Sequence, residues 1–140
     1  MQEPWGYNKH IDMVEVLPGH LAKAVRHART RRCGIRISGR LSALFAPVPA
    51  AGLPATLDFS PLERYPELPQ LMLDDFAVSA VCRTDVLYSL PQLAVLILEQ
   101  PLDIDISRLA ALKDLRCVYS PAVRNIGAAE KLERLHLWSY

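Results

Sequence analysis

Histidine is the side chain best suited to acid, base or metal chemistry near neutral pH. The chain contains four histidines, His10, His20, His27 and His136. His20 and His27 are seven residues apart. On a helix they would lie about 10 Å apart along the axis, too far to bind one metal ion together. His136 paired with Asp114 would suit a small hydrolase, but no nucleophile or oxyanion site accompanies them. We therefore predict surface or structural histidines.

In an extended segment, the side chains of Asp103 and Asp105 would point to the same side. Paired carboxylates of this kind can bind a metal ion or take part in acid–base catalysis. No third ligand accompanies them, and a solvated, turn-forming role suits Asp105 better. The three cysteines, Cys33, Cys82 and Cys117, are widely spaced and contain no CxxC pair. That pattern argues against a disulfide framework and a zinc site. We therefore expect reduced, mostly buried thiols, no metal and no cofactor.

The common sequence motifs of enzymes are absent. The chain has no GxSxG elbow, no Walker A loop, no GxGxxG and no HExxH. Its 51% apolar and 22% charged residues indicate a globular protein, and stretches such as 93–98 are too short to span a bilayer. The first residues lack the basic and apolar regions of a secretory signal. We therefore expect a cytoplasmic protein that is not an enzyme and does not contact a membrane.

Residues 20–40 carry seven basic residues and no acidic one. They are Lys23, Arg26, Arg29, Arg31, Arg32, Arg36 and Arg40. Phosphate contacts dominate nucleic-acid affinity, so this segment could bind a nucleic-acid backbone. Aromatic residues that would stack on single-stranded bases are missing, and so is any recognised nucleic-acid motif. A solvated helix face is the simpler interpretation. A docking surface for an acidic protein and nucleic-acid binding are the alternatives.

Charge is distributed in bands along the chain, although the net charge is only +1. Residues 1–50 contain 8 Lys or Arg and 3 Asp or Glu. Residues 57–105 contain 2 Lys or Arg and 9 Asp or Glu, and residues 106–140 contain 6 Lys or Arg and 3 Asp or Glu. Such banding can steer a charged partner onto one surface, but it does not specify a fold.

Four segments repeat one pattern of apolar residues, spaced three, three and two positions apart. They are Tyr65, Leu68, Leu71, Leu73; Leu90, Leu93, Leu96, Leu98; Leu109, Leu112, Leu115, Cys117; and Ala129, Leu132, Leu135, Leu137. Successive units are offset by 25, 19 and 20 residues. The three-residue spacing suits a helical or irregular turn, and the two-residue step suits a strand with one buried face. Units this short must stack on their neighbours, which predicts a solenoid.

This pattern resembles the leucine-rich repeat family, whose strand segment reads LxxLxL. The matching segments are 68–73, 93–98, 112–117 and 132–137. Residues 105–109 resemble the convex return segment of such repeats, and residues 58–62 resemble an earlier copy. The family's Asn after the strand is absent from every unit. The resemblance implies an α/β fold over residues 51–140, a short leucine-rich-repeat-like solenoid with a parallel sheet.

The register of the repeats has an alternative. Strands at 57–59 and 76–78 would bring the intervals nearer 20 residues throughout. We prefer the first register because it aligns Pro66-Glu67-Leu68 with Pro91-Gln92-Leu93, in segments 66–68 and 91–93.

Residues 1–50 are predicted to form an N-terminal α/β cap on the solenoid, within a single compact domain. Apolar residues at positions 21, 24, 25 and 28 predict an amphipathic helix over residues 19–31. Residues 34–38 alternate with the period of a strand, and residues 11–16 give a weaker strand signal. A Pro- and Ala-rich connector at 46–54 marks the boundary. A cap would cover the apolar surface and sheet edge of the first unit.

Partners of leucine-rich repeats usually bind a concave sheet lined by the side chains that alternate with the buried leucines. Carried over to this chain, that row is Gln70, Met72, Asp74; Val95, Ile97, Glu99; Asp114, Arg116, Val118; Arg134, His136 and Trp138. From it we predict eight partner-binding residues, Met72, Asp74, Ile97, Glu99, Arg116, Arg134, His136 and Trp138. Arg and Trp are enriched in binding hot spots. A covering N-terminal segment, or a register shifted by one, is the alternative.

These features predict a non-catalytic protein-binding module. The narrower hypothesis is a stoichiometric inhibitor, similar in size and build to bacterial immunity proteins, which neutralise the active site of a cognate toxin. The expected partner is another protein, which by this analogy would be a toxin. The last strand, near Trp138 and Tyr140, has no residues after it to cover its edge, so a homodimer through that edge is an open alternative.

Overall fold

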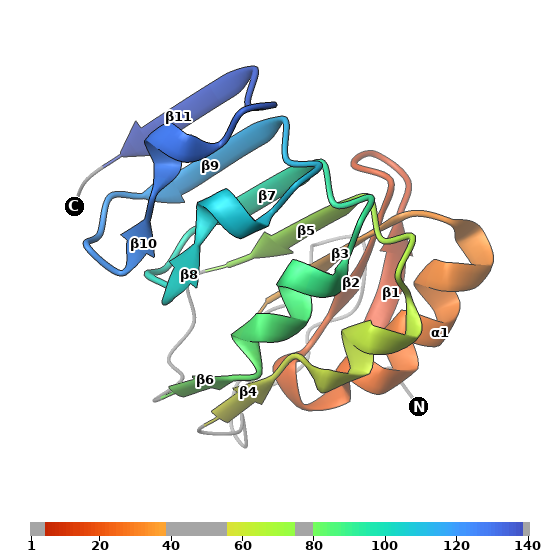
Figure 1. Cartoon of the computed structure of the whole chain (residues 1–140). Coiled ribbons are helices and arrows are strands. Elements are labelled where there is room, and N and C mark those ends of the chain that lie inside the picture. The colour runs from red at the N-terminus through yellow and green to blue at the C-terminus, as the bar shows by residue number, and fades with distance from the viewer. Residues whose placement is uncertain (1–4, 39–55, 75–79, 139–140) are drawn as a thin grey trace.

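The computed structural model describes residues 5–38, 56–74 and 80–138. It is a mixed α/β structure with a mostly parallel seven-stranded sheet and one α-helix (Figure 1). In spatial order the strands are β1 (Trp5–Asn8), β2 (Met13–Val16), β3 (Gly34–Ile37), β5 (Gln70–Leu73), β7 (Val95–Leu98), β9 (Asp114–Val118) and β11 (Arg134–Trp138). Only β1 and β2 pair antiparallel. The predicted α/β class with a parallel sheet is confirmed at this level.

The N-terminal part follows the predicted helix and strands closely. A 3₁₀ turn, η1 (Pro18–His20), leads into α1 (Leu21–Arg31), whose buried side is the apolar stripe expected from the sequence. The helix ends at Arg32, which adopts a left-handed backbone conformation and donates its N–H to the last turn. None of the described helices is both long and apolar enough to cross a membrane. The predicted connector at 46–54 lies outside the described residues.

One arrangement then recurs four times, namely a short strand, a 3₁₀ helix and a strand of the main sheet. The short strands are β4 (Thr56–Asp58), β6 (Ala80–Cys82), β8 (Ile104–Asp105) and β10 (Val123–Arg124). The 3₁₀ helices are η2 (Ser60–Arg64), η3 (Thr84–Ser89), η4 (Ile106–Arg108) and η5 (Ile126–Ala128). β4 pairs in parallel with β6, and β8 with β10, in two sheets apart from the main one. The strand that the rival register placed at 57–59 overlaps β4, but β4 lies outside the main sheet; residues 76–78 are not described.

Two of the 3₁₀ helices begin with the same side-chain hydrogen bonds. Oδ1 of Asp58 accepts from the backbone N of Ser60 at 2.8 Å and from its hydroxyl at 2.6 Å. Oδ1 of Asp105 accepts from the same two groups of Ser107 at 3.1 and 2.6 Å. The serine bonds lower the pKa of both carboxyl groups, and Asn125 lowers that of Asp105 further. Asp105 therefore forms a turn, as predicted.

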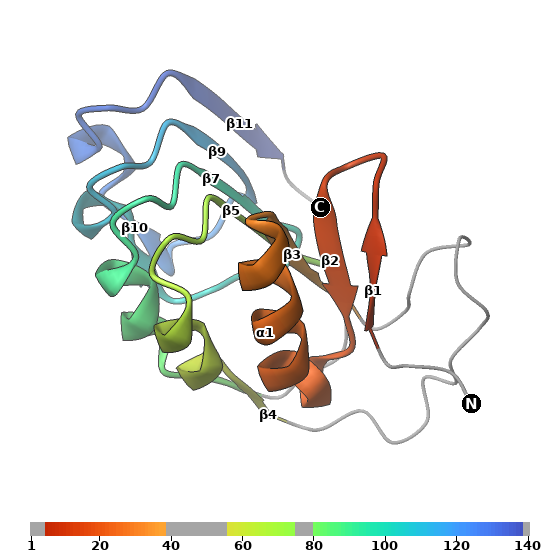
Figure 2. The same ribbon diagram turned by 90° about the vertical axis from the view of Figure 1, so that its right-hand side faces the viewer.

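The core lies between the main sheet and the layer formed by α1 and the 3₁₀ helices (Figure 2). Inward-facing leucines of β5 and β7 are fully buried, and the leucines in the turns before β5, β7 and β9 are buried as well. The two predicted parts of the chain share this core, because β3 pairs directly with β5. Cys33 and Cys117 are buried free thiols whose pKa burial raises, whereas the free thiol of Cys82 is exposed.

Gly34 is required where β3 passes close to β5. A Cβ atom at this position would lie 2.8 Å from the backbone O of Gln70 and 3.2 Å from Cγ of Met13. We expect Gly34→Ala to lower the free energy of unfolding by about 1–3 kcal/mol, as overpacking of a core does, measured by urea denaturation. Gly127→Ala is the matched control, because a Cβ there meets nothing within 4 Å. Equal stability of the two variants would contradict this close packing.

Candidate binding face of the sheet

All helices described here lie on one side of the main sheet (Figures 1 and 2). We call the opposite side the strand face. Strand pairing places one residue from each of the six strands β2, β3, β5, β7, β9 and β11 in a row across it. The middle row is Glu15, Arg36, Met72, Ile97, Arg116 and His136. The residues at or just after the strand ends form the next row. All eight predicted partner-binding residues lie on this face.

The β2–β3 end of the strand face holds an internal charge cluster. Glu15 is 0% exposed, and its carboxylate accepts from Nδ2 of Asn8 at 2.6 Å. Nη1 of Arg36 lies 3.3 Å from Oε2 of Glu15. The same guanidinium donates from Nε to Oδ1 of Asp74 at 3.1 Å and from Nη2 to Oδ2. Arg36 therefore holds two carboxylates that water scarcely reaches.

The charge cluster corrects one part of the predicted site. Asp74 is buried, and its carboxylate is bound by Arg36 instead of facing outward for a partner. Burial lowers the pKa of Arg36, but the hydrogen bond and charge of Asp74, with the charges of Glu15 and Glu99, raise it overall. Arg36 thus stays a cation. Glu99 is half-buried and belongs to the same electrostatic environment.

The β9–β11 end of the strand face is open and basic. Arg116, Arg134 and His136 are exposed, and the His136 ring lies 5.4 Å from the Trp138 ring. Nε and Nη2 of Arg116 lie 3.3 and 3.2 Å from the two carboxylate oxygens of Asp114. The Asp114 carboxylate therefore contacts an arginine of its own strand, and within the described residues no hydrogen bond or ion pair joins it to His136. Between the two ends, Met72 and Ile97 are half-buried, less exposed than expected.

The edge of the sheet at β11 exposes apolar side chains. Leu135 and Leu137 point to the core side, yet they are 48% and 39% exposed. Their pairing partners on β9, Leu115 and Cys117, are fully buried. Within the described residues β11 pairs with β9 alone, so one row of its backbone N–H and C=O groups has no strand beside it. We call β11 and its exposed side chains the C-terminal edge.

The other predicted chemistry does not assemble into a site. Among the described residues, no three His, Cys, Asp or Glu side chains stand together as a metal site would require. Asp103 lies 3.3 Å from Arg124 and Asp105 caps a turn, so the two carboxylates serve separate contacts. The His27 ring lies 4.4 Å from the Trp5 ring. Burial lowers the pKa of His27, and the charge of Arg31 lowers it further.

The basic segment does not form one surface. Lys23, Arg26 and Arg29 are exposed on α1, whereas Arg36 lies on the strand face inside the charge cluster. The guanidinium of Arg31 lies over the Tyr7 ring at 4.0 Å. Arg40 is outside the described residues. The described cations of this segment are therefore divided between opposite sides of the sheet.

The chain was also compared with models of known protein families, with curated proteins and with solved structures. None of the three comparisons gives a match. We therefore infer function from the strand face and the C-terminal edge.

Proposed function

We propose that this chain is a non-catalytic protein-binding module, built as a short leucine-rich-repeat-like solenoid with an N-terminal cap. The recurring unit of short strand, 3₁₀ helix and main-sheet strand supports this architecture, because each unit is too short to bury its own leucines. The observation that carries the functional proposal is the C-terminal edge. A sheet edge with half-exposed leucines attracts another strand or apolar surface.

The alternation along β11 indicates the chemistry of the partner. Arg134 and His136 point to the strand face, and Leu135 and Leu137 point to the other side. A segment that pairs with this edge would place its own side chains alternately beside these two sets. We therefore propose an extended partner segment in which acidic residues alternate with apolar ones. Arg116 would add to the attraction for its acidic side.

The narrower proposal is a stoichiometric inhibitor, of the kind formed by bacterial immunity proteins that neutralise a toxin. A binding surface confined to one edge and the neighbouring half of one face suits a single protein ligand. The banded charge, with its basic C-terminal band, would favour an acidic region of that ligand. One dominant partner at near-equal stoichiometry is the expected result.

The proposal is tested by affinity capture from native lysate, with tagged wild type and an Arg134→Glu/Leu137→Lys edge variant. Ile11→Lys/Arg124→Glu is the matched control, because Ile11 is 40% exposed and Arg124 is exposed in the same final unit. We expect the edge variant to bind its partner at least about 30-fold more weakly, the effect of losing one hot-spot residue. The control should bind like wild type. Equal loss in both, or no captured protein, would contradict the proposal.

A second copy of the chain is the other possible occupant of the edge. Pairing β11 with itself would bring two sets of Arg134 and His136 together, and like charges on adjacent strands are unfavourable. We therefore expect a monomer by light scattering. A dimer that the edge variant abolishes would replace the partner proposal with self-association.

Nucleic acid is the alternative partner, since Lys23, Arg26, Arg29 and Arg32 are exposed on or next to α1. Nucleic-acid binding would weaken steeply with salt and would be lost on charge reversal of Arg29 and Arg32. It would not respond to the edge variant, so the same capture experiment separates the two functions.

A further inference from the structure

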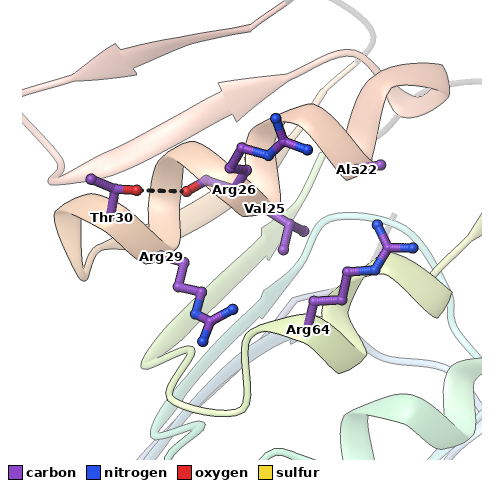
Figure 3. A pocket seen from close by; sticks show the side chains of 6 residues that line it. All are labelled: Ala22, Val25, Arg26, Arg29, Thr30 and Arg64. Carbon is purple, nitrogen blue, oxygen red and sulfur yellow. Dashed lines mark hydrogen bonds between the residues drawn. The ribbon is translucent and has the colours of Figure 1, made fainter.

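We propose that the cleft between α1 and η2 binds a small organic phosphate monoester. Six residues line it, Ala22, Val25, Arg26, Arg29, Thr30 and Arg64 (Figure 3). Its volume of about 410 Å³ falls in the range of small-molecule sites. The cleft lies on the helix side of the sheet, opposite the strand face. It is therefore a second site, independent of the proposed protein-binding edge.

Three of the cleft's residues are arginines that have no ionic partner within the part of the chain that the structure describes. Six of the eleven described arginines contact a carboxylate or an aromatic ring, namely Arg31, Arg36, Arg83, Arg108, Arg116 and Arg124. The other five have no side-chain partner among the described residues. Three of these five, Arg26, Arg29 and Arg64, line this one cleft. Their unbalanced charge favours an anion.

The composition of the cleft suits a dianionic group on an organic molecule. Arg26 and Arg29 extend from α1, and Arg64 extends from η2 on the other side of the gap (Figure 3). Guanidinium groups bind phosphate oxygens with paired hydrogen bonds, and a monoester offers three such oxygens and nearly two charges. Ala22 and Val25 give the cleft an apolar part for the organic group. A phosphodiester carries only one charge and would neutralise the three arginines less well.

The two elements that form the cleft are held in place without a ligand. α1 buries its apolar stripe against the sheet, and Leu62 of η2 is fully buried. The hydroxyl of Tyr65, directly after η2, donates to the backbone O of Cys33 at 2.9 Å, close to the end of α1. Thr30 is occupied as well, since its hydroxyl donates to the backbone O of Arg26 at 3.1 Å. The arginines therefore project from a preformed scaffold.

The test measures phenyl phosphate binding to the full chain by calorimetry. We expect saturable binding with a dissociation constant below about 1 mM at pH 7.5. Arg26→Ala and Arg64→Ala should each weaken it at least about tenfold, since each removes a charged hydrogen-bond donor. Arg32→Ala and Arg134→Ala are the matched controls, because both side chains are exposed, neither has a carboxylate partner among the described residues, and both lie outside the cleft. Binding should also weaken at pH 5, where the monoester takes up its second proton.

Four results would overturn the proposal. Absence of saturable binding at millimolar phenyl phosphate would show that the cleft is not a phosphate site. Equal weakening of phenyl phosphate binding by the cleft and control variants would show that binding depends only on the overall positive charge of the protein. Tighter binding of a ten-nucleotide oligothymidine, dependent on Arg32, would assign the arginines to nucleic acid. Much tighter binding of a phosphoserine peptide would assign the phosphate to a protein instead of a small molecule.

Discussion

Replacing Arg36 with methionine is expected to lower the free energy of unfolding by about 3–5 kcal/mol, the cost of leaving a buried charge without its partner. Arg36 neutralises Glu15, which is 0% exposed, and Asp74, which is also buried. Asn8 would still donate to Glu15, but an amide hydrogen bond supplies no positive charge to balance a buried negative charge. Urea denaturation followed by circular dichroism at pH 7 measures the change.

Arg116→Met is the matched control. Arg116 lies in the same row three strands further along, but its side chain is 48% exposed and its ion pair with Asp114 is partly solvated. We expect this variant to lose about 0–1 kcal/mol. Adding Glu15→Gln to Arg36→Met should recover part of the lost stability, because it removes one of the two buried negative charges. If Arg36→Met costs no more than Arg116→Met, the charge cluster is not a structural element.

Stability is also expected to fall between about pH 10 and pH 12 through the ionisation of Tyr65. Its side chain is 1% exposed, and burial, followed by nearby acidic groups, raises its pKa from 10.0 to about 12. Between these values the unfolded chain releases the phenol proton while the folded chain retains it. The stabilisation is therefore complete below pH 10 and lost as the pH rises through 12. Its upper limit is about 2–3 kcal/mol, measured by urea denaturation across this range.

Tyr65→Phe isolates this contribution. It should cost about 1 kcal/mol at pH 7, where the hydrogen bond to Cys33 is lost, but its stability should fall less steeply above pH 10. Cys33 and Cys117, whose pKa burial also raises, contribute to the slope of both proteins and cancel in the comparison. Tyr119→Phe, at an exposed position, should leave the slope unchanged. Parallel curves for wild type and Tyr65→Phe would contradict the burial of a neutral phenol.

Much of the fold follows from local spacing. The apolar stripe of α1 and the apolar residues spaced three, three and two positions apart both indicate which side of a segment is buried. The helix and the main-sheet strands were therefore predictable. β1 was not predicted, because Trp5–Asn8 is short and lies at a sheet edge. The short strands such as Ile104–Asp105 were not predicted either. Two or three residues carry too little periodicity to reveal a strand.

The candidate site was predictable in its composition but not in its contacts. Alternation along each strand was enough to place the eight residues on one face, because parallel strands in register repeat the same orientation. The burial of Asp74 depends on Arg36, 38 residues earlier, and on the order β2, β3, β5. The cleft likewise depends on residues far apart in the sequence, because Arg64 of η2 must lie beside α1. A continuous basic run in the sequence conceals that its members face opposite sides of a sheet.

The half-exposed leucines of β11 have a consequence for the energetics of recognition. In a stack of similar units, the surface that each unit buries in the next is part of the driving force for folding. Leu135 and Leu137 remain partly exposed in the isolated chain, so their share of this driving force has not been gained. A ligand strand at this position would act as one more rung, supplied from another molecule. Binding would then continue the folding of the sheet, with apolar contact giving affinity and the charge of Arg134 giving selectivity.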